Sequence, residues 1–206
     1  MKRLAQRADY DHATIDAILD EGLVAHVGMV DDTGQPFVIP MVYGRDGHRL
    51  LLHGSVASRL QRHLADGAPV SVTVTLLDGL VLARSMFHHS VNYRSVVVLG
   101  TATAITDASR AASALERIVE HLVPGRTAEA RAPTPKELAQ TTVLEVPLAE
   151  ASAKVRTGGP ADEADDLGLD VWAGVVPLSL AVGAPQPAGD LAPGIPVAPS
   201  ALAWRR

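Results

Sequence analysis

The sequence predicts a mainly β fold, an antiparallel barrel with peripheral helices. Short apolar or alternating segments follow one another with tight turns between them, and few helices intervene. The strand–helix alternation of a doubly wound α/β fold is missing. Because 47% of the residues are hydrophobic but only two Trp, three Tyr and two Phe are present, the predicted core is aliphatic. A chain of 206 residues is long enough to bury such a core.

The first predicted elements are a helix and three strands. Asp11 is placed to cap a helix over residues 11–21, which Gly22 ends. Turn signals separate the strands, among them Asp31-Asp32-Thr33-Gly34. A second helix is expected over residues 56–66, with Ser55 as its N-cap. The strands are predicted over residues 23–30, 37–43 and 49–53.

The second half continues the alternating pattern and adds one long helix. Residues 70–77 and 79–85 are predicted strands, joined as a hairpin by Asp78-Gly79. A long strand is expected over residues 92–105, with Gly100 as a bulge or bend. The helix over residues 107–123 has clear helical spacing of its apolar residues, and Pro124-Gly125 ends it. The last strands are predicted over residues 141–147 and 171–180.

Composition divides the chain into one domain and a tail. Residues 1–180 form the predicted domain, and the acidic segment 158–166 inside it is expected to be a solvated loop. Residues 181–206 form a tail rich in Pro and Ala, and five of the 14 prolines lie within 183–206. We therefore expect that tail to be irregular.

Charge and composition exclude several classes of function. The net charge of −5 and the lack of a basic run argue against a nucleic-acid partner. The absence of cysteine excludes disulfides, thiolate nucleophiles and iron–sulfur clusters. No secretory signal and no apolar run of membrane-spanning length is visible, so the predicted location is the cytoplasm. Neither a P-loop nor a Gly-x-Ser-x-Gly elbow is present.

One polar cluster lies where a predicted strand meets the second helix. Gly54, Ser55, Ser58 and Arg59 combine a residue without Cβ, two hydroxyls and a guanidinium at a helix start. Backbone N–H groups and the positive dipole end point out of a helix N-terminus, so this pattern is typical of a phosphate site. A capped surface helix explains the same residues.

A second polar cluster, residues 87–95, begins the long strand. His88 and His89 are placed to bind a metal or move protons, but neighbours in a strand face opposite sides, which disfavours a metal site. Asn92 and Arg94 share one face and would hold a polar ring or a second phosphate. A polar strand entry satisfied by turn hydrogen bonds explains them equally well.

Taken together, these segments resemble the pyridoxamine 5′-phosphate oxidase-like flavin-binding split-barrel family. The resemblance covers roughly residues 10–177 and is closest to the branch that contains nitroimidazole reductases. It implies an antiparallel split β-barrel of the FMN-binding type. The segments that carry it are Phe37-Val-Ile-Pro-Met-Val-Tyr43, Leu52-His-Gly-Ser-Val-Ala-Ser-Arg59, Asn92-Tyr-Arg-Ser95 and Val171-Trp-Ala-Gly174.

The resemblance also implies a cofactor, a partner and a set of site residues. The cofactor would be FMN, bound at the interface of a homodimer that accepts a small-molecule substrate. Ser58 and Arg59 would hold the phosphate, and Trp172 would close the site. His88, His89 and Tyr43 are the candidate proton donors, and no metal site is implied. The full set of implied cofactor-binding residues is Met41, Val42, Tyr43, His53, Gly54, Ser55, Ser58, Arg59, Arg94, Ser95 and Trp172.

Departures from the family pattern limit the expected chemistry. The oxidase binds the phosphate of the vitamin with an arginine at the position of Val176, so pyridoxamine phosphate oxidation is not expected. The leading hypothesis is an FMN-dependent oxidoreductase that reduces a small organic acceptor. The alternatives are a non-catalytic flavin carrier or sensor, a split barrel that binds haem or a deazaflavin, and a dimerisation module without a cofactor. For haem, His88 and His89 would be the candidate axial ligands.

Overall fold

The computed structural model describes residues 8–9 and 11–205, which form two compact units. Unit 1 contains the described residues up to 22 together with 73–97 and 151–180, and unit 2 contains residues 23–72, 98–150 and the described residues from 181 on. The strands are β1 (Ala8–Asp9), β2 (Val24–Val30), β3 (Pro36–Asp46), β4 (Arg49–Ser55), β5 (Pro69–Leu82), β6 (Ser90–Thr101), β7 (Thr103–Ala104), β8 (Thr141–Pro147), β9 (Glu150–Arg156) and β10 (Gly174–Pro177). The helices are α1 (His12–Glu21), α2 (Arg59–Ala65), α3 (Ala108–Leu122), α4 (Pro135–Ala139) and α5 (Pro199–Ala203).

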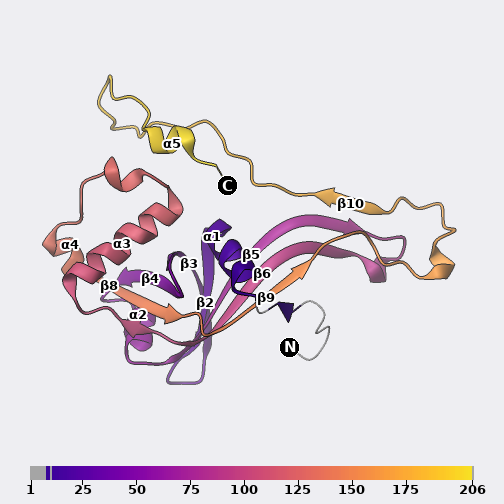
Figure 1. Ribbon diagram of the computed structural model, residues 1–206, viewed down its shortest axis with the longest axis horizontal. Coiled ribbons are helices and arrows are strands. Elements are labelled where there is room, and N and C mark those ends of the chain that lie inside the picture. Colours follow the sequence, from indigo (N-terminus) through magenta and orange to yellow (C-terminus); the bar gives the residue numbers. More distant parts are fainter. Residues whose placement is uncertain (1–7, 10, 206) are drawn as a thin grey trace. The chain divides into compact units, whose positions relative to one another are not determined.

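The fold is the split β-barrel that the sequence predicts, mainly antiparallel with peripheral helices. The strand order is β1-β9-β6-β5-β2-β3-β4-β8-β7, and β10 pairs with β5 (Figure 1). Residues in register include Met29 with Phe37 in β2–β3 and His53 with Val143 in β4–β8. Among the described residues, no helix is both long and apolar enough to span a bilayer.

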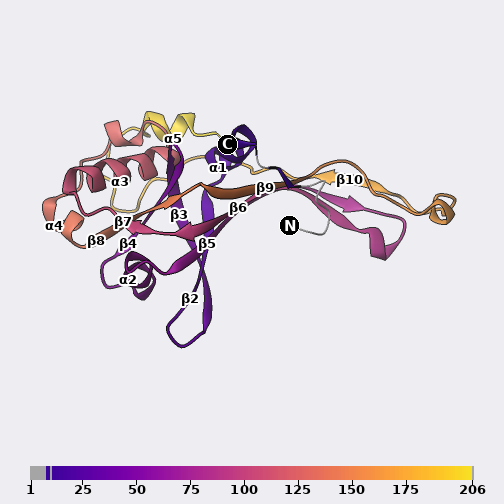
Figure 2. The same cartoon turned by 60° about the horizontal axis from the view of Figure 1, so that its bottom comes forward.

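In unit 2, α2 and α3 cover the strands that carry the site. Helix α3 packs on β3, β4 and β8, while α2 packs on β4, β7 and β8 from the other side (Figure 2). Ile118 of α3 lies close to Gly44 of β3: a Cβ added to Gly44 would lie 3.0 Å from the Cα of Ile118. The strand residues facing α3 are Leu51 and Val143, which form a small core with Ala114 and Ile118.

In unit 1, buried apolar residues come from α1 and from the parts of β5 and β6 that belong to this unit, residues 73–82 and 90–97. Helix α1 begins after Asp11, whose carboxylate accepts from the Thr14 amide, and ends at Gly22 as predicted. Ile15, Ile18 and Leu19 form its buried face.

Helix α3 likewise has the predicted bounds to within one residue. The predicted strands 23–30, 37–43, 49–53 and 141–147 are confirmed, with small changes at their ends.

The predicted hairpin at Asp78-Gly79 is wrong, because β5 runs without a break from Pro69 to Leu82. A glycine at position 79 lets the backbone of β10 come close to β5. Gly79 is in register with Pro177 of β10, and an added Cβ would lie 3.1 Å from the Val176 carbonyl oxygen. The predicted strand 92–105 is divided at Ala102 into β6 and β7. The predicted last strand shortens to Gly174–Pro177.

Three further segments differ from the prediction. The second helix begins at Arg59 with Ser58 as its N-cap, so the expected start at residue 56 with a Ser55 cap is wrong. The segment 158–166 is not fully solvated, because the Asp162 side chain is buried against Arg84. The tail ends in α5, where irregular chain was expected. The domain boundary at residue 180 stays a prediction.

Candidate functional site

The sequence-predicted site residues are divided between the two units, so each group is described by itself. Those of unit 2 lie on β3, β4 and the start of α2, and those of unit 1 lie on or near β6 and before β10. The first group is Met41, Val42, Tyr43, His53, Gly54, Ser55, Ser58 and Arg59. The second is His88, His89, Arg94, Ser95 and Trp172.

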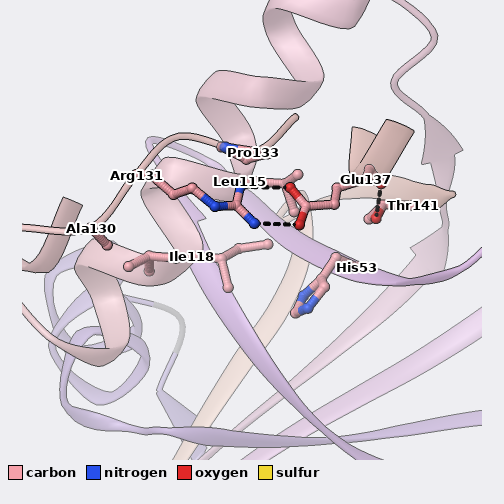
Figure 3. Close-up of a pocket in the computed structure, with 9 residues that line it drawn as sticks. His53, Leu115, Ile118, Ala130, Arg131, Pro133, Glu137 and Thr141 are labelled. Carbon is pink, nitrogen blue, oxygen red and sulfur yellow. Dashed lines mark hydrogen bonds and ion pairs between the residues drawn. The ribbon is translucent and has the colours of Figure 1, made fainter. Parts of the chain in front are cut away.

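His53 opens onto a largely apolar pocket in unit 2. Strand β4 carries the histidine, and α3, α4 and the segment between them form the walls (Figure 3). The pocket has a volume of about 450 Å³ and is open to solvent on one side. Its lining residues are His53, Leu115, Ile118, Val119, Ala130, Arg131, Pro133, Glu137 and Thr141.

The imidazole of His53 has a polar atom that folding leaves without a partner. Its Nδ1 is buried and makes no hydrogen bond within the described part of the chain. Burial lowers the pKa of His53, because a charged imidazolium is poorly solvated there. The ring is therefore neutral near pH 7. A neutral imidazole facing an apolar pocket is the form in which histidine binds a metal centre.

One ion pair lies at the edge of the same pocket. Arg131 donates from Nη2 to Glu137 Oε1 at 2.6 Å and from Nη1 to Oε2 at 2.8 Å (Figure 3). These bonds, with those from Thr134 at the start of α4, lower the pKa of Glu137 to about 2. Both groups are therefore charged at neutral pH, and the pair places two opposite, mutually neutralising charges beside an apolar pocket.

In the expected phosphate cluster of unit 2, Ser55 and Arg59 are exposed and Gly54 and Ser58 are half-buried. The Ser58 hydroxyl accepts from the Gln61 amide as the N-cap of α2, and Ser55 Oγ accepts from the Ala57 amide. Arg59 is 62% exposed at the side chain, with its Nη1 3.6 Å from Asp31 Oδ2 and its guanidinium 4.2 Å from the centre of the Phe37 ring. The hydroxyl and guanidinium donors are therefore within reach of a ligand from solvent.

Gly54 is needed because a buried amide lies directly against it. An added Cβ would lie 2.7 Å from Gln61 Nε2. Gln61 is 1% exposed, and neither Oε1 nor Nε2 has a partner in the described part of the chain. Sequence reasoning missed Gln61. The signal was a polar residue directly after Leu60 on the helix face that carries Leu60 and Leu64.

The β3 residues contribute less than expected at the side-chain level. Tyr43 is fully buried, and its ring centre lies 4.7 Å from that of His121. A proton donor must reach its substrate, so this burial argues against Tyr43 in that role. Met41 and Val42 are half-buried. Their predicted contact with a flavin ring stays a prediction.

In unit 1, Arg94 is engaged by carboxylates of the protein itself. It donates to Glu21 at 2.5 and 2.8 Å and to Asp78 at 2.8 and 3.0 Å. These hydrogen bonds, those to Glu21 first, raise its pKa further above the ordinary arginine value. Asn92 accepts from Arg156 and donates to the Gly158 carbonyl. The geometry therefore explains Arg94 and Asn92 as structural, the alternative that the sequence left open.

The two adjacent histidines are separated in their contacts. His88 Nε2 lies 3.5 Å from Glu163 Oε1, whereas His89 Nδ1 lies 2.9 Å from the Ser85 carbonyl oxygen. Ser95 Oγ donates to the Lys154 carbonyl at 3.4 Å, and Trp172 is 67% exposed. Among the described residues, no three His, Asp or Glu side chains gather as a metal cluster.

The sequence did not indicate one further ion pair of unit 1, in which Arg84 Nη1 lies 2.7 Å from Asp162 Oδ2.

The comparison with family models decides the ancestry of this fold. The model described as pyridoxamine 5′-phosphate oxidase matches residues 11–155, which is more than half of the chain. The chain belongs to the pyridoxamine 5′-phosphate oxidase family. The matched segment contains β2 to β8, most of β9 and the whole His53 pocket, so the family relationship includes the candidate site.

Solved structures of this fold include two that match almost end to end. The flavocytochrome Anf3 from Azotobacter vinelandii is 41% identical, with a TM-score of 0.93 over 100% of this chain and 95% of that one. An FAD and haem binding protein from Mycobacterium smegmatis is 41% identical, with a TM-score of 0.91 over 95% and 96%.

A more distant structure shares the fold alone. It is a putative 5-nitroimidazole antibiotic resistance protein from Bacteroides thetaiotaomicron, 24% identical with a TM-score of 0.61 over 72% of this chain and 86% of that one. No curated protein sequence matches the chain.

Proposed function

We propose that this protein is a redox protein that binds a flavin and a haem. The observation that carries the proposal is the half-buried imidazole of His53, which lines an apolar pocket and whose buried Nδ1 makes no hydrogen bond within the described part of the chain. Two relatives support it, because they are 41% identical over nearly the whole chain and are described as a flavocytochrome and an FAD and haem binding protein.

The His53 pocket has the chemistry that a haem requires. His53 offers a ring nitrogen for the iron, and Leu115, Ile118 and Val119 offer apolar side chains for the macrocycle. Arg131 at the edge would bind an acidic substituent in exchange for part of its pairing with Glu137. Sequence reasoning named haem as an alternative but placed it at His88 and His89. We assign it to His53, because that imidazole lines an apolar pocket of about 450 Å³.

The flavin would be held through its phosphate by Ser55, Ser58 and Arg59, as the family resemblance implies. The three residues lie within a five-residue segment from the end of β4 to the start of α2, and the Arg59 side chain is mostly exposed. The sequence predicted FMN, whereas the FAD named for one relative favours the dinucleotide. We propose FAD, with FMN as the alternative that the released cofactor would reveal.

The combination suggests an oxidoreductase in which electrons pass through the bound groups. When bound, the flavin supplies two-electron chemistry and the haem supplies one-electron chemistry. The residues of the chain bind, orient and shield these groups. The sequence predicted that a small organic molecule accepts the electrons, and this stays an alternative. A second alternative is a flavin carrier that catalyses no reaction. The homodimer and the cytoplasmic location stay predictions.

The test is an absorbance spectrum of the purified full chain after addition of hemin and flavin. We expect wild-type protein to give a shifted Soret band and a bound flavin whose identity chromatography establishes. His53→Ala should lose the Soret shift and keep the flavin, because only the iron ligand is removed. His48→Ala, an exposed histidine at the β3–β4 turn, is the matched control.

Two results would contradict the assignment. A wild-type protein that leaves the hemin spectrum unchanged would exclude the haem site. An unaltered Soret band in His53→Ala would move the ligand elsewhere, with His88 and His89 the next variants to test.

A further inference from the structure

The outer wall of the His53 pocket is a segment held mainly by polar contacts. Residues 129–132, between the 3-10 helix Arg126–Ala128 and α4, are all exposed. Ala130, Arg131 and Pro133 line the His53 pocket, and the same residues line a second cavity of about 270 Å³ against α3. The segment therefore borders open space in two adjoining cavities, and it is free to shift unless other contacts fix it.

The end of the chain fixes this wall at one side. The Ser200 amide donates to Glu129 Oε1 at 2.9 Å, and the Ser200 hydroxyl donates to Glu129 Oε2. Arg126 also donates to Oε2 at 3.2 Å. Ser200 is 6% exposed although it lies in a tail that is otherwise largely exposed, so the contact is a specific one.

A second contact fastens the same tail to α3. The Trp204 indole Nε1 donates to the Leu122 carbonyl oxygen at 2.6 Å, at the last turn of the helix. That carbonyl is one of the groups that a helix C-terminus leaves without an intrahelical partner. Ser200 and Trp204 together therefore attach α5 to both the wall and the helix that supports it.

We propose that residues 199–204 form a latch that holds the wall of the His53 pocket and so controls how fast a large planar ligand enters and leaves. The latch rests on the proposed haem site. The Arg131–Glu137 pair fixes the wall at its other side, directly before and within α4. Release of Ser200 from Glu129 would let residues 129–133 move and so change the width of the pocket that they line.

The test measures the wall and the ligand separately in the full-length protein. Amide hydrogen exchange of peptides covering residues 126–133 reports the wall without any ligand. Transfer of hemin from the loaded protein to excess apomyoglobin reports the exit rate. We expect Ser200→Ala to speed both by about ten-fold, because a hydrogen bond to a charged group is lost. Glu129→Gln weakens the same contact from the other side and should act in the same direction.

Ser109→Ala, an exposed serine of α3, is the matched control and should leave both rates unchanged. Unchanged exchange in both latch variants would overturn the latch. Faster exchange with an unchanged hemin rate would overturn its control of the pocket. If wild-type protein binds no hemin, the proposal of the haem site and the proposal that the latch controls it are both contradicted. Its unshifted Soret band would separate that result from the failure of the latch alone.

Discussion

At the scale of single residues, the sequence does not show which polar atoms of the candidate site find a partner. His53 Nδ1 and the Gln61 amide are buried without a partner in the described part of the chain, while Arg94 is bound by Glu21, 73 positions away. A sequence pattern shows which residue types are present but not which carboxylate a guanidinium will meet. For this reason the sequence indicated His53 and Arg59 as polar residues near a cofactor. It also placed Arg94 in the cofactor site, although Arg94 is bound by carboxylates of the protein itself.

Arg59 gives the prediction that belongs to this scale. We expect Arg59→Ala to weaken flavin binding at least about ten-fold, because a charge-assisted bond to phosphate is lost. Arg62→Ala, an exposed arginine of the same helix, is the control for the change in net charge. Titration of each apoprotein with flavin, followed by fluorescence quenching, gives the two dissociation constants. Equal constants for the two variants would remove Arg59 from the flavin site.

At the scale of elements, the sequence predicted which segments form helices and strands better than where they begin. Alternation and capping residues identified α1 and α3 to within one residue. At α2 two serines competed as caps, and Ser58 prevailed because β4 extends to Ser55. At Asp78-Gly79 the dipeptide suggested a turn, although the glycine is required by the approach of β10. Tertiary contacts that overrule a local signal cannot be read from the local signal.

Gly79 provides the test of that explanation. We expect Gly79→Ala to lower the free energy of unfolding by about 1–3 kcal/mol, because its Cβ would meet the backbone of β10. Gly100→Ala in β6 is the matched control: no described residue has an atom within 4 Å of its added Cβ, so a change within about 0.5 kcal/mol is expected. Urea unfolding followed by circular dichroism measures both. Equal stabilities would mean that β10 shifts aside without cost.

At the scale of the whole molecule, the order of segments carried the family relationship that no single motif established. The fold class and the family were predictable because alternation and segment order survive sequence change. The docking of α5 was not, because Ser200 and Glu129 are 71 positions apart in segments without a periodic signal. The predicted homodimer is also a property of this scale, since a partner surface is fixed by the assembled sheet.

The β2–β3 ladder presents a surface on which the homodimer can be tested. Its register places Gly28 opposite Val38 and Val30 opposite Pro36, so these residues share one face, and Val30 and Val38 are 56% and 65% exposed. We expect wild-type protein to sediment as a dimer and Val38→Asp to shift it toward monomer, because a charge cannot be buried there without a partner. Val182→Asp, another exposed valine, should leave the dimer intact. A monomeric wild type would contradict the homodimer itself. A dimeric Val38→Asp variant would place the interface on another surface and leave the exposed ladder to be explained by a different partner.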